Sequence, residues 1–446
     1  MSNKKSDRRS FLMNASSAVG AAIFAAPAIF ASEGRPKDER GRSVGPNDEI
    51  RTAILGIRNQ GRNHINYHQA TPNIRIATLC DPDERLFAER VKLVADGKPK
   101  TETDLCRVLD DKNIDCIAVT MPNYWHALAT VWACQAGKDV YVEKPATYCI
   151  AEGRRMIAAR DKYNRIVQSG TQMRANPAHQ EAAKLLREGL LGPIYMVRAI
   201  YFDQRLSIGR QPDGAVPDGV HYDLWMGPSA KQTFNPNRFH YNWHWFWETG
   251  NGEIGNNGPH LADLVIHGLD RQDTLPVKIS SQGGRFVWDD QGQTPNTLAA
   301  SYTYADGLLL EMEIRNLPTN REDRVAEAAF FHGPKGYMMI EGERGRYESV
   351  VDKKPGPSGK APGAHAELVR NFYDAVRSRK TSDLLSPVEH GHIGAALCHL
   401  ANISYRLGRT LEFEPKTETF PHDDAANAML TRTYRAPYVM PELNDI

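Results

Sequence analysis

Cysteine, long apolar runs and an excess of either charge are what this 446-residue chain lacks. Its six cysteines form no Cys-x-x-Cys pair, which excludes a disulfide framework and a zinc module and predicts isolated packing thiols. No apolar run of about 18 residues follows the N-terminal region, which excludes an integral membrane protein. Lys and Arg number 55 against 54 Asp and Glu, so the charge balance gives no reason to expect a nucleic acid or a membrane surface as a partner.

The N-terminus has the pattern of an export signal. Arg8 and Arg9 precede Ser-Phe-Leu, and a weakly hydrophobic Ala/Gly-rich stretch with an Ala-Pro-Ala cleavage pattern at 26–28 follows. Residues 1–31 thus resemble a twin-arginine signal peptide; the alternative is a basic amphipathic helix. We expect 32–48, rich in Gly, Pro and charge, to be a flexible linker. The predicted location is the periplasm or the medium, reached folded through the twin-arginine export machinery.

Short β-branched runs alternate with helical stretches from Glu49 to about residue 170. This order predicts an α/β domain over 49–170, a doubly wound parallel sheet that binds its ligand at the carboxyl ends of the strands. The predicted strands are 50–57, 74–80, 115–120, 140–143 and 166–169, and the predicted helices are 61–70, 83–95, 125–136 and 151–163.

A glycine-containing turn follows the first predicted strand. In the segment 56–62, Gly56 and Gly61 match the first and third glycines of a dinucleotide fingerprint, whereas Arg58 replaces the middle one. Asp81 ends the second strand 25 residues after Gly56, where a carboxylate accepts ribose hydroxyls and repels a 2′-phosphate. The pattern favours NAD over NADP, although Arg58 could neutralise a pyrophosphate or reach a 2′-phosphate. A solvated turn that binds nothing is the alternative. The predicted cofactor-binding residues in this segment are Gly56, Arg58, Asn59, Gly61, Arg62 and Asp81.

The next strand ends carry a Pro-x-x-x-His turn at 122–126 and a Glu-Lys-Pro triplet at 143–145. With the segment Gly250–Asp263 and the tail segments 396–405 and 430–437, they resemble the Gfo/Idh/MocA oxidoreductases, the family of glucose-fructose oxidoreductase and inositol dehydrogenase. The resemblance covers nearly all of the chain after the linker. It implies that the cofactor site also includes Pro122, Asn123, Trp125, His126, Glu143, Lys144 and Gln172.

The same resemblance implies a C-terminal α/β domain over 171–446 with a large open, mainly antiparallel sheet. Strand-like runs at 194–202, 278–282, 297–304, 308–315 and 330–332 agree with it, and 304–307 reads as a hairpin turn. In relatives this sheet also forms subunit contacts, so we expect a homo-oligomer.

Lys144 and His260 are the predicted catalytic residues. An ammonium beside Pro145 can hold a substrate hydroxyl and stabilise the developing alkoxide, and an imidazole can take the accompanying proton. Asn256 stands where many family dehydrogenases carry aspartate, so the expected proton relay is incomplete. Asp263 either orients His260 or is a helix-packing carboxylate, and His267 is a weaker candidate that could equally be a core histidine.

An aromatic segment at 238–248 can present flat faces to a sugar ring. Half of its rings are expected only to pack the loop onto the sheet. The predicted substrate-binding residues are Lys144, Tyr241, Trp243, Trp245, Asn256, His260 and Asp263. Three histidines at 240, 244 and 260 with Glu248 lack a compact ligand spacing, so no metal is expected.

Export and a nicotinamide site together predict a tightly bound cofactor that is recycled within each catalytic cycle. The substrate is then a sugar or glycoside whose hydride passes to a second carbonyl acceptor. The alternatives are a redox-neutral NAD-dependent glycosidase, which oxidises, eliminates and re-reduces, and a non-catalytic sugar-binding protein that retains the fold.

Overall fold

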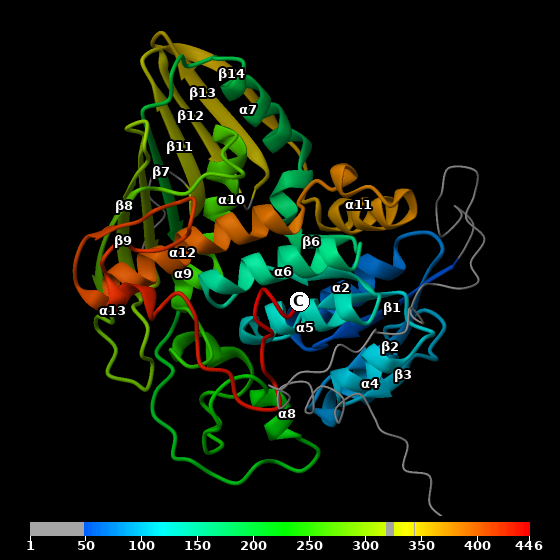
Figure 1. Cartoon of the computed structure of the whole chain (residues 1–446). Coiled ribbons are helices and arrows are strands. Elements are labelled where there is room, and N and C mark those ends of the chain that lie inside the picture. Colours follow the sequence, from blue (N-terminus) through cyan, green and yellow to red (C-terminus); the bar gives the residue numbers. More distant parts are fainter. Residues whose placement is uncertain (1–48, 318–324, 343) are drawn as a thin grey trace, which may run out of the picture.

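The computed structural model describes residues 49–317, 325–342 and 344–446. They form two sheets with helices around them (Figure 1). The predicted signal and linker, 1–31 and 32–48, lie outside the described residues, so the export signal remains a prediction. All six cysteines are buried and free, as predicted. Among the described residues, no helix is long and apolar enough to cross a membrane.

The first sheet is parallel, with six strands in the order β3-β2-β1-β4-β5-β6. This confirms the predicted doubly wound Rossmann sheet. Its strands are β1 (Ile50–Leu55), β2 (Ile74–Cys80), β3 (Lys100–Glu102), β4 (Cys116–Val119), β5 (Asp139–Glu143) and β6 (Val167–Gly170). Its helices are α2 (Asn59–Gln69), η1 (Glu84–Leu86), α3 (Phe87–Val91), α4 (Leu105–Asp110), η2 (Asn123–Trp125), α5 (His126–Gln135) and α6 (Ile150–Lys162).

Most predicted bounds in this domain lie within two residues of the observed ones, and two of the differences have a clear local cause. The first strand ends at Leu55 instead of residue 57, because Gly56 turns the chain with φ +82°. The predicted helix 83–95 is split into η1 and the short α3, because Asp83 caps the first turn through a bond from the backbone N–H of Arg85.

The second sheet has nine strands in the order β14-β13-β12-β11-β7-β10-β9-β8-β15. Its pairs are antiparallel except β7 with β10, which confirms a large, mainly antiparallel sheet. The strands are β7 (Met196–Phe202), β8 (Lys278–Gly284), β9 (Thr297–Thr303), β10 (Leu309–Arg315), β11 (Glu327–Gly333), β12 (Gly336–Glu341), β13 (Arg346–Val351), β14 (Lys354–Lys360) and β15 (Leu411–Glu412).

Helices cover one face of this sheet. In β10, Leu310, Met312 and Ile314 are buried while the residues between them are partly exposed, as the two-residue period of a strand requires. The remaining helices are η3 (Gln172–Ala175), α7 (Pro177–Arg187), α8 (Tyr222–Met226), η4 (His240–Trp245), α9 (Gly252–Asn256), α10 (Gly258–Leu269), α11 (His365–Ser378), η5 (Thr381–Asp383), α12 (Val388–Leu407) and α13 (Asp424–Asn427). Their apolar faces and the sheet share one core, which includes Leu261, Leu310 and Leu397.

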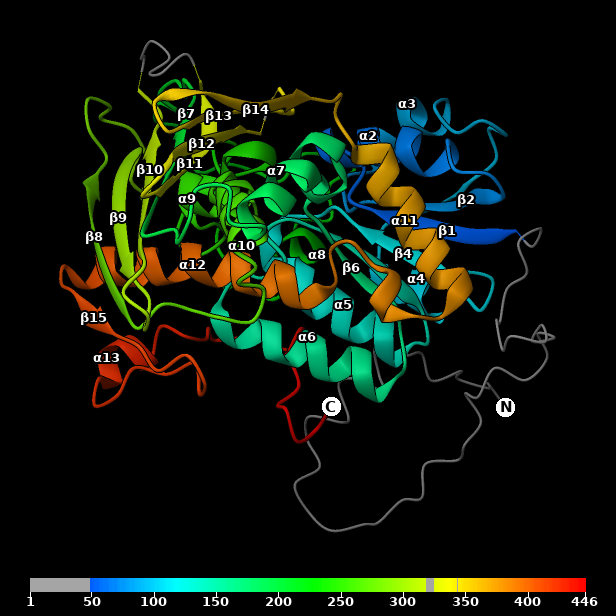
Figure 2. The same ribbon diagram turned by 90° about the horizontal axis from the view of Figure 1, so that it is seen from above.

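Two C-terminal segments return to the Rossmann sheet. Helix α11 buries Leu368 and Phe372 against Tyr141 of β5, and Figure 2 shows it lying beside α2. The final residues pack Tyr438 against Trp125, with ring centroids 5.2 Å apart.

Residues 204–247, named the cap below, connect β7 to the loop before α9. They lie at the bottom of Figure 1, around α8. Tyr222, Trp225, Met226, Phe234 and Phe239 form a small hydrophobic cluster of its own within the cap. The cap is therefore a packed body rather than an extended loop.

Candidate active site

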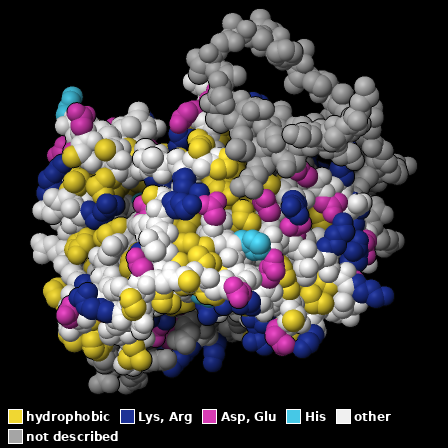
Figure 3. Space-filling model, turned by 90° about the horizontal axis from the view of Figure 1, so that it is seen from below, with side chains coloured by type: hydrophobic (Ala, Val, Ile, Leu, Met, Phe, Trp, Pro, Cys, Tyr) yellow, Lys and Arg dark blue, Asp and Glu magenta, His cyan; other side chains and the backbone are white. Residues whose placement is uncertain are grey.

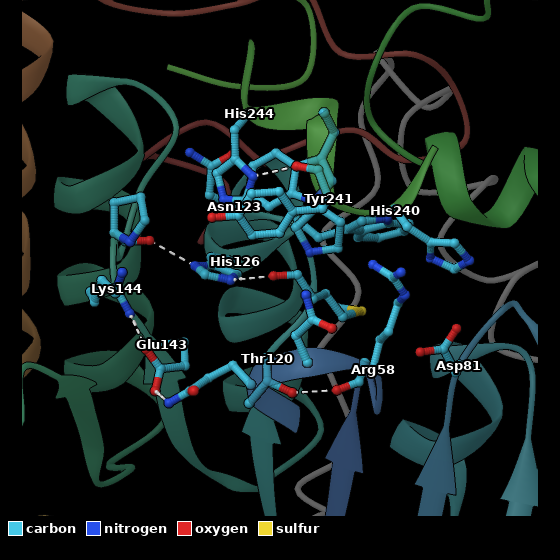
Figure 4. Close-up of a pocket in the computed structure, with 18 of the residues that line it drawn as sticks. Arg58, Asp81, Thr120, Asn123, His126, Glu143, Lys144, His240, Tyr241 and His244 are labelled. Carbon is cyan, nitrogen blue, oxygen red and sulfur yellow. Dashed lines mark hydrogen bonds between the residues drawn. The ribbon is translucent and has the colours of Figure 1, made fainter. Parts of the chain in front are cut away.

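A cavity of about 490 Å³ lies at the carboxyl ends of the Rossmann strands. The turn after β1, the end of β2, the turn after β4 and the end of β5 all contribute to its wall. The opposite wall comes from the cap, from α9 and α10, and from Tyr438. Figure 4 shows Lys144 and Asp81 on opposite sides of the cavity, so we distinguish a Lys144 end and an Asp81 end.

Most of the predicted cofactor residues line this cavity. They are Gly56, Arg58, Asn59, Asp81, Pro122, Asn123, Trp125, His126, Glu143, Lys144 and Gln172. Gly61 packs beneath the turn instead: a Cβ there would lie 1.8 Å from the carbonyl oxygen of Gly56, so only glycine allows this approach. Arg62 is exposed and does not line the cavity.

The Asp81 end combines a buried carboxylate with a guanidinium. Asp81 accepts hydrogen bonds from the backbone N–H groups of Ile57 and Asp83, each at 2.9 Å. Burial raises the pKa of Asp81 to about 6, against the opposing effect of these two bonds. Arg58 makes no side-chain hydrogen bond to a described residue and lies between Asp81 and His240 (Figure 4). Burial lowers its pKa, while Asp83 and Asp81 raise it.

Lys144 lies at the other end of the cavity, directly after strand β5. Its Nζ donates to the backbone oxygen of Asn256 at 2.9 Å, which leaves two ammonium protons for a ligand. Burial lowers the pKa of Lys144, and the nearby carboxylates of Glu143 and Glu253 oppose that shift.

The carboxylate of Glu143 lies beside Lys144 and is itself held by several hydrogen bonds. One carboxylate oxygen accepts from Gln60 at 3.1 Å and lies 2.8 Å from Nε2 of His64, and the other accepts from the backbone N–H of Lys144 at 3.0 Å. Burial alone would raise the pKa of Glu143, but His64 and then Lys144 outweigh it and bring the value to about 2. A fixed negative charge therefore lies beside the lysine.

His260 lies in the first turn of α10 and lines the cavity. Its imidazole makes no hydrogen bond to a described residue, and its Nδ1 is buried without a partner. Burial holds its pKa well below the ordinary value, and the charge of Lys144 acts in the same direction. The ring is thus neutral near pH 7, which is the form that accepts a proton.

Two predicted substrate residues are not in the cavity. Asp263 does not orient His260: it faces Arg174, whose Nε donates to it at 2.6 Å, so the reading as a packing carboxylate is the correct one. His267 lies beside the same arginine, with 3.5 Å between Nη1 and Nδ1. Trp245 is buried outside the cavity, because its position on η4 turns it away.

The aromatic segment divides between packing and lining. Tyr241 and Trp243 line the cavity together with His240 and His244, whereas Phe239 and Phe246 are buried away from it. Trp247 lies under the guanidinium of Arg406, 4.9 Å from the ring centroid. In the described part of the chain, no group of three or more His, Cys, Asp or Glu is placed to hold a metal ion.

Two charged residues of the site were missed by the sequence analysis. Glu253 is fully buried on α9, one helical turn before Asn256, and accepts a hydrogen bond from that amide at 3.1 Å. Arg205, at the start of the cap, donates to Glu253 at 3.0 and 3.3 Å and lines the cavity. An acid three residues from the atypical Asn256 was the available signal for Glu253; Arg205 had none, because it lies 48 residues away in the sequence.

Comparisons with known proteins cover both sheets. Residues 50–171 match the family model described as "Oxidoreductase family, NAD-binding Rossmann fold", and residues 179–440 match "Oxidoreductase family, C-terminal alpha/beta domain". The Rossmann domain is therefore an NAD-binding domain by family, as predicted.

Relatives with assigned names match over shorter stretches. The chain is 30% identical to scyllo-inositol 2-dehydrogenase (NAD(+)) of Bacillus subtilis over 154 residues, 33% of this chain and 43% of that protein. It is 21% identical to a glycosyl hydrolase family 109 protein of Shewanella pealeana over 213 residues, 45% and 47% of the two chains. The chain thus spans less than half the length of either relative.

A solved structure matches over more of the chain. The aldose-aldose oxidoreductase of Caulobacter crescentus has a TM-score of 0.64 at 18% identity, covering 82% of this chain and 100% of that one. At this identity the likeness shows a shared fold.

Proposed function

The chain belongs to the Gfo/Idh/MocA oxidoreductase family, and from that premise we propose that it oxidises a hydroxyl of a sugar or glycoside by hydride transfer to a tightly held nicotinamide dinucleotide. The observation that carries the proposal is the placement of Lys144 and His260 in the same cavity as Gly56 and Asp81. The substrate class is supported by Tyr241 and Trp243 in the wall, and by the names of the dehydrogenases that the chain resembles.

The residues at the Asp81 end fit a dinucleotide. A Cβ at Gly56 would come within 2.8 Å of the backbone nitrogen of Met121. The turn after β1 therefore packs against the turn after β4 so closely that only glycine fits at this position. Helix α2 begins there, and no described side chain caps its N-terminal N–H groups. These groups and Arg58 suit a pyrophosphate, and Asp81 suits ribose hydroxyls. When bound, NAD supplies the hydride acceptor; NADP fits less well because Asp81 repels a 2′-phosphate.

The protein's own residues then handle the hydroxyl and its proton. The two free ammonium protons of Lys144 hold the substrate oxygen and stabilise the negative charge that develops on it. The neutral imidazole of His260 accepts the proton. Asn256 and Tyr241 orient the ring of the substrate, since an amide and a phenol can bond hydroxyls but do not take this proton.

Activity of a Lys144→Ala variant tests the proposal. We expect the wild-type protein to oxidise members of a sugar and glycoside panel and to release NAD or NADH on denaturation, detected by mass spectrometry. Lys144→Ala should lose turnover, and Lys184→Ala, an exposed lysine on α7 outside the cavity, should retain it. A protein without bound or bindable dinucleotide contradicts the proposal.

A redox-neutral glycosidase is the second candidate. It is favoured by the likeness to a glycosyl hydrolase family 109 protein. Oxidation of one hydroxyl acidifies the neighbouring C–H, so that this proton and the glycosidic group can be eliminated. In D₂O, addition of water across the resulting double bond places deuterium at that carbon, and re-reduction of the ketone then gives the released sugar. Net formation of NADH or of a reduced acceptor, with no cleaved glycoside, identifies the oxidoreductase instead. A sugar-binding protein without catalysis would bind the sugar and show neither product.

Location and assembly belong to the same proposal. The pattern at residues 1–31 supports export by the twin-arginine route to the periplasm or the medium. The partly exposed face of the large sheet, on the side away from α7, α10 and α12 (Figure 1), supports a homo-oligomer. Light scattering of the purified protein and fractionation of cells expressing the full chain test the two points.

A further inference from the structure

The cap is fastened to the Rossmann domain directly after Asp81. Asp83 and Val220 form an antiparallel β-bridge. The N–H of Glu84 donates to the carbonyl oxygen of Gly219, and the N–H of His221 donates to that of Pro82, both at 2.8 Å. The residues that follow the predicted ribose-binding acid are therefore paired, backbone to backbone, with a segment of the other domain.

Two side-chain pairs reinforce this seam. Nε2 of His240 lies 2.8 Å from Oδ2 of Asp83, and Nε2 of His221 lies 2.6 Å from Oε1 of Glu84. The first pair is largely buried, and the second is about half exposed. His240 has a left-handed backbone (φ +62°), a conformation that a non-glycine residue keeps only where surrounding contacts hold it.

A second seam joins the cap to the turn after β4. The hydroxyl of Tyr124 and Nε1 of Trp125 both donate to the carbonyl oxygen of Trp225, at 2.6 and 3.2 Å. At Gly227 a Cβ would lie 2.0 Å from the ring of Trp125, so the cap backbone touches the indole. Since the cap has its own hydrophobic cluster, a movement that opens these two seams displaces the cap as a rigid body.

The cap also forms one wall of the cavity. Leu224, Trp225, His240, Tyr241 and Trp243 face the same space as Gly56 and Asp81. A dinucleotide that lies along the strand ends would thus have the Rossmann domain on one side and the cap on the other.

We propose that the cap retains the dinucleotide through successive turnovers, with the pairs His240–Asp83 and His221–Glu84 fastening it over the Asp81 end. This rests on the proposed function. It assigns to cap residues a role in cofactor retention. It also requires that the hydride taken from the substrate carbon and the proton taken from its hydroxyl be delivered to the carbon and the oxygen of a carbonyl group before the next cycle. The acceptor is a second sugar carbonyl or the oxidised sugar itself, so no soluble oxidant is consumed.

Exchange of the bound dinucleotide tests the retention. The full-length protein is incubated with an excess of isotopically labelled NAD, and uptake of the label is followed after rapid gel filtration. The variants are His221→Ala, His240→Gly, which also accepts the positive φ, and the double variant. The matched control is Arg409→Ala, which breaks the pair of Arg409 with Asp423 outside the cap and leaves both seams intact.

We expect the wild type and the control to exchange over hours, and the double variant to exchange at least tenfold faster with an unchanged melting temperature. If the double variant does not fold, His221→Ala alone, at an exposed position, should exchange about threefold faster. Two outcomes would overturn the proposed retention by the cap while leaving the proposed function intact. One is a wild-type protein that contains NAD but exchanges it within seconds, and the other is a double variant that exchanges NAD as slowly as the wild type does. Protein that neither contains nor binds a dinucleotide overturns the retention and the proposed function together.

Discussion

The two ends of the cavity are built on different principles. At the Lys144 end, each charge has a protein partner: Glu143 lies next to Lys144, and Arg205 donates to Glu253. At the Asp81 end, Arg58 makes no side-chain hydrogen bond to a described residue, and the wall is completed by a segment more than a hundred residues away in the sequence. The first end is arranged to fix and move a proton, and the second is arranged to receive an anion and enclose it.

The surface near the cap shows no such specialisation. In Figure 3, which shows the molecule from below, blue and magenta side chains are interspersed over the described part of this face. Neither sign of charge dominates the described part of this face, which agrees with a small-molecule ligand rather than a polyanion.

Removing the chemistry of the Lys144 end should have the largest effect. Lys144→Ala and His260→Ala should each lower kcat by roughly 10²-fold or more, because a positioned acid-base group contributes about 10² to 10⁴. The fold-decrease in kcat of the double variant should be smaller than the product of the two single fold-decreases, since both groups act on one hydroxyl. Steady-state kinetics on the sugar panel measure this, and near-wild-type turnover in both single variants would place the active site elsewhere.

Low pH should reduce the contribution of ionised Glu143, the carboxylate beside Lys144, to the stability of the fold. The folded pKa of Glu143, about 2, lies below its unfolded value of roughly 4, so its stabilisation is present above about pH 4 and is lost as the pH falls toward 2. Urea unfolding of wild type and Glu143→Gln should differ by about 3 kcal/mol at pH 6. The difference should shrink below pH 4; a difference that stays constant down to pH 3 contradicts this role.

The charge of Asp81 should set the cofactor preference at the other end. Asp81→Asn keeps an acceptor for only one of the two backbone N–H groups, those of Ile57 and Asp83, and it removes the repulsion of a 2′-phosphate. The preference for NAD over NADP should therefore narrow by about tenfold. Because the pKa of Asp81 is about 6, the wild-type preference should also weaken as the pH falls below 6. Binding titrations with both nucleotides between pH 5 and 8 check this. An unchanged preference in Asp81→Asn points to Arg58 as the discriminator.

The smallest effect is expected at Asn256. Asn256→Asp should leave kcat within about threefold of wild type or raise it, since the proton acceptor is His260 and the amide does not take the proton. The variant loses the hydrogen bond that this amide donates to Glu253, which limits any gain. The pH profile is the sharper readout. The depressed pKa of His260 predicts no acid-side loss of activity between pH 6 and 8 in wild type, and a loss in that range would show that a different group accepts the proton.

The sequence patterns that predicted secondary structure correctly were those contained within a few neighbouring residues. The run 74–80 was predicted as a strand with the bounds that β2 has, and the hairpin at 304–307 joins β9 to β10. Strands β3, β12, β13, β14 and β15 were not predicted. For the edge strand β14 the reason is its composition, because Lys354–Lys360 contains two prolines, two glycines and two lysines and shows no apolar alternation. Its pairing comes from the neighbouring strand and not from its own pattern.

The sequence by itself determined the Rossmann order and the glycine turn, because each depends on residues close to a strand end. The resemblance to the family pointed to Lys144 and His260, and the structure places both in one cavity. Tertiary structure alone decided that Asp263 faces Arg174, that Glu253 and Arg205 complete the Lys144 end, and that the cap covers the Asp81 end. These contacts join residues 48 to 157 positions apart. Their partners are fixed by how two sheets pack, and no periodicity within a segment records that.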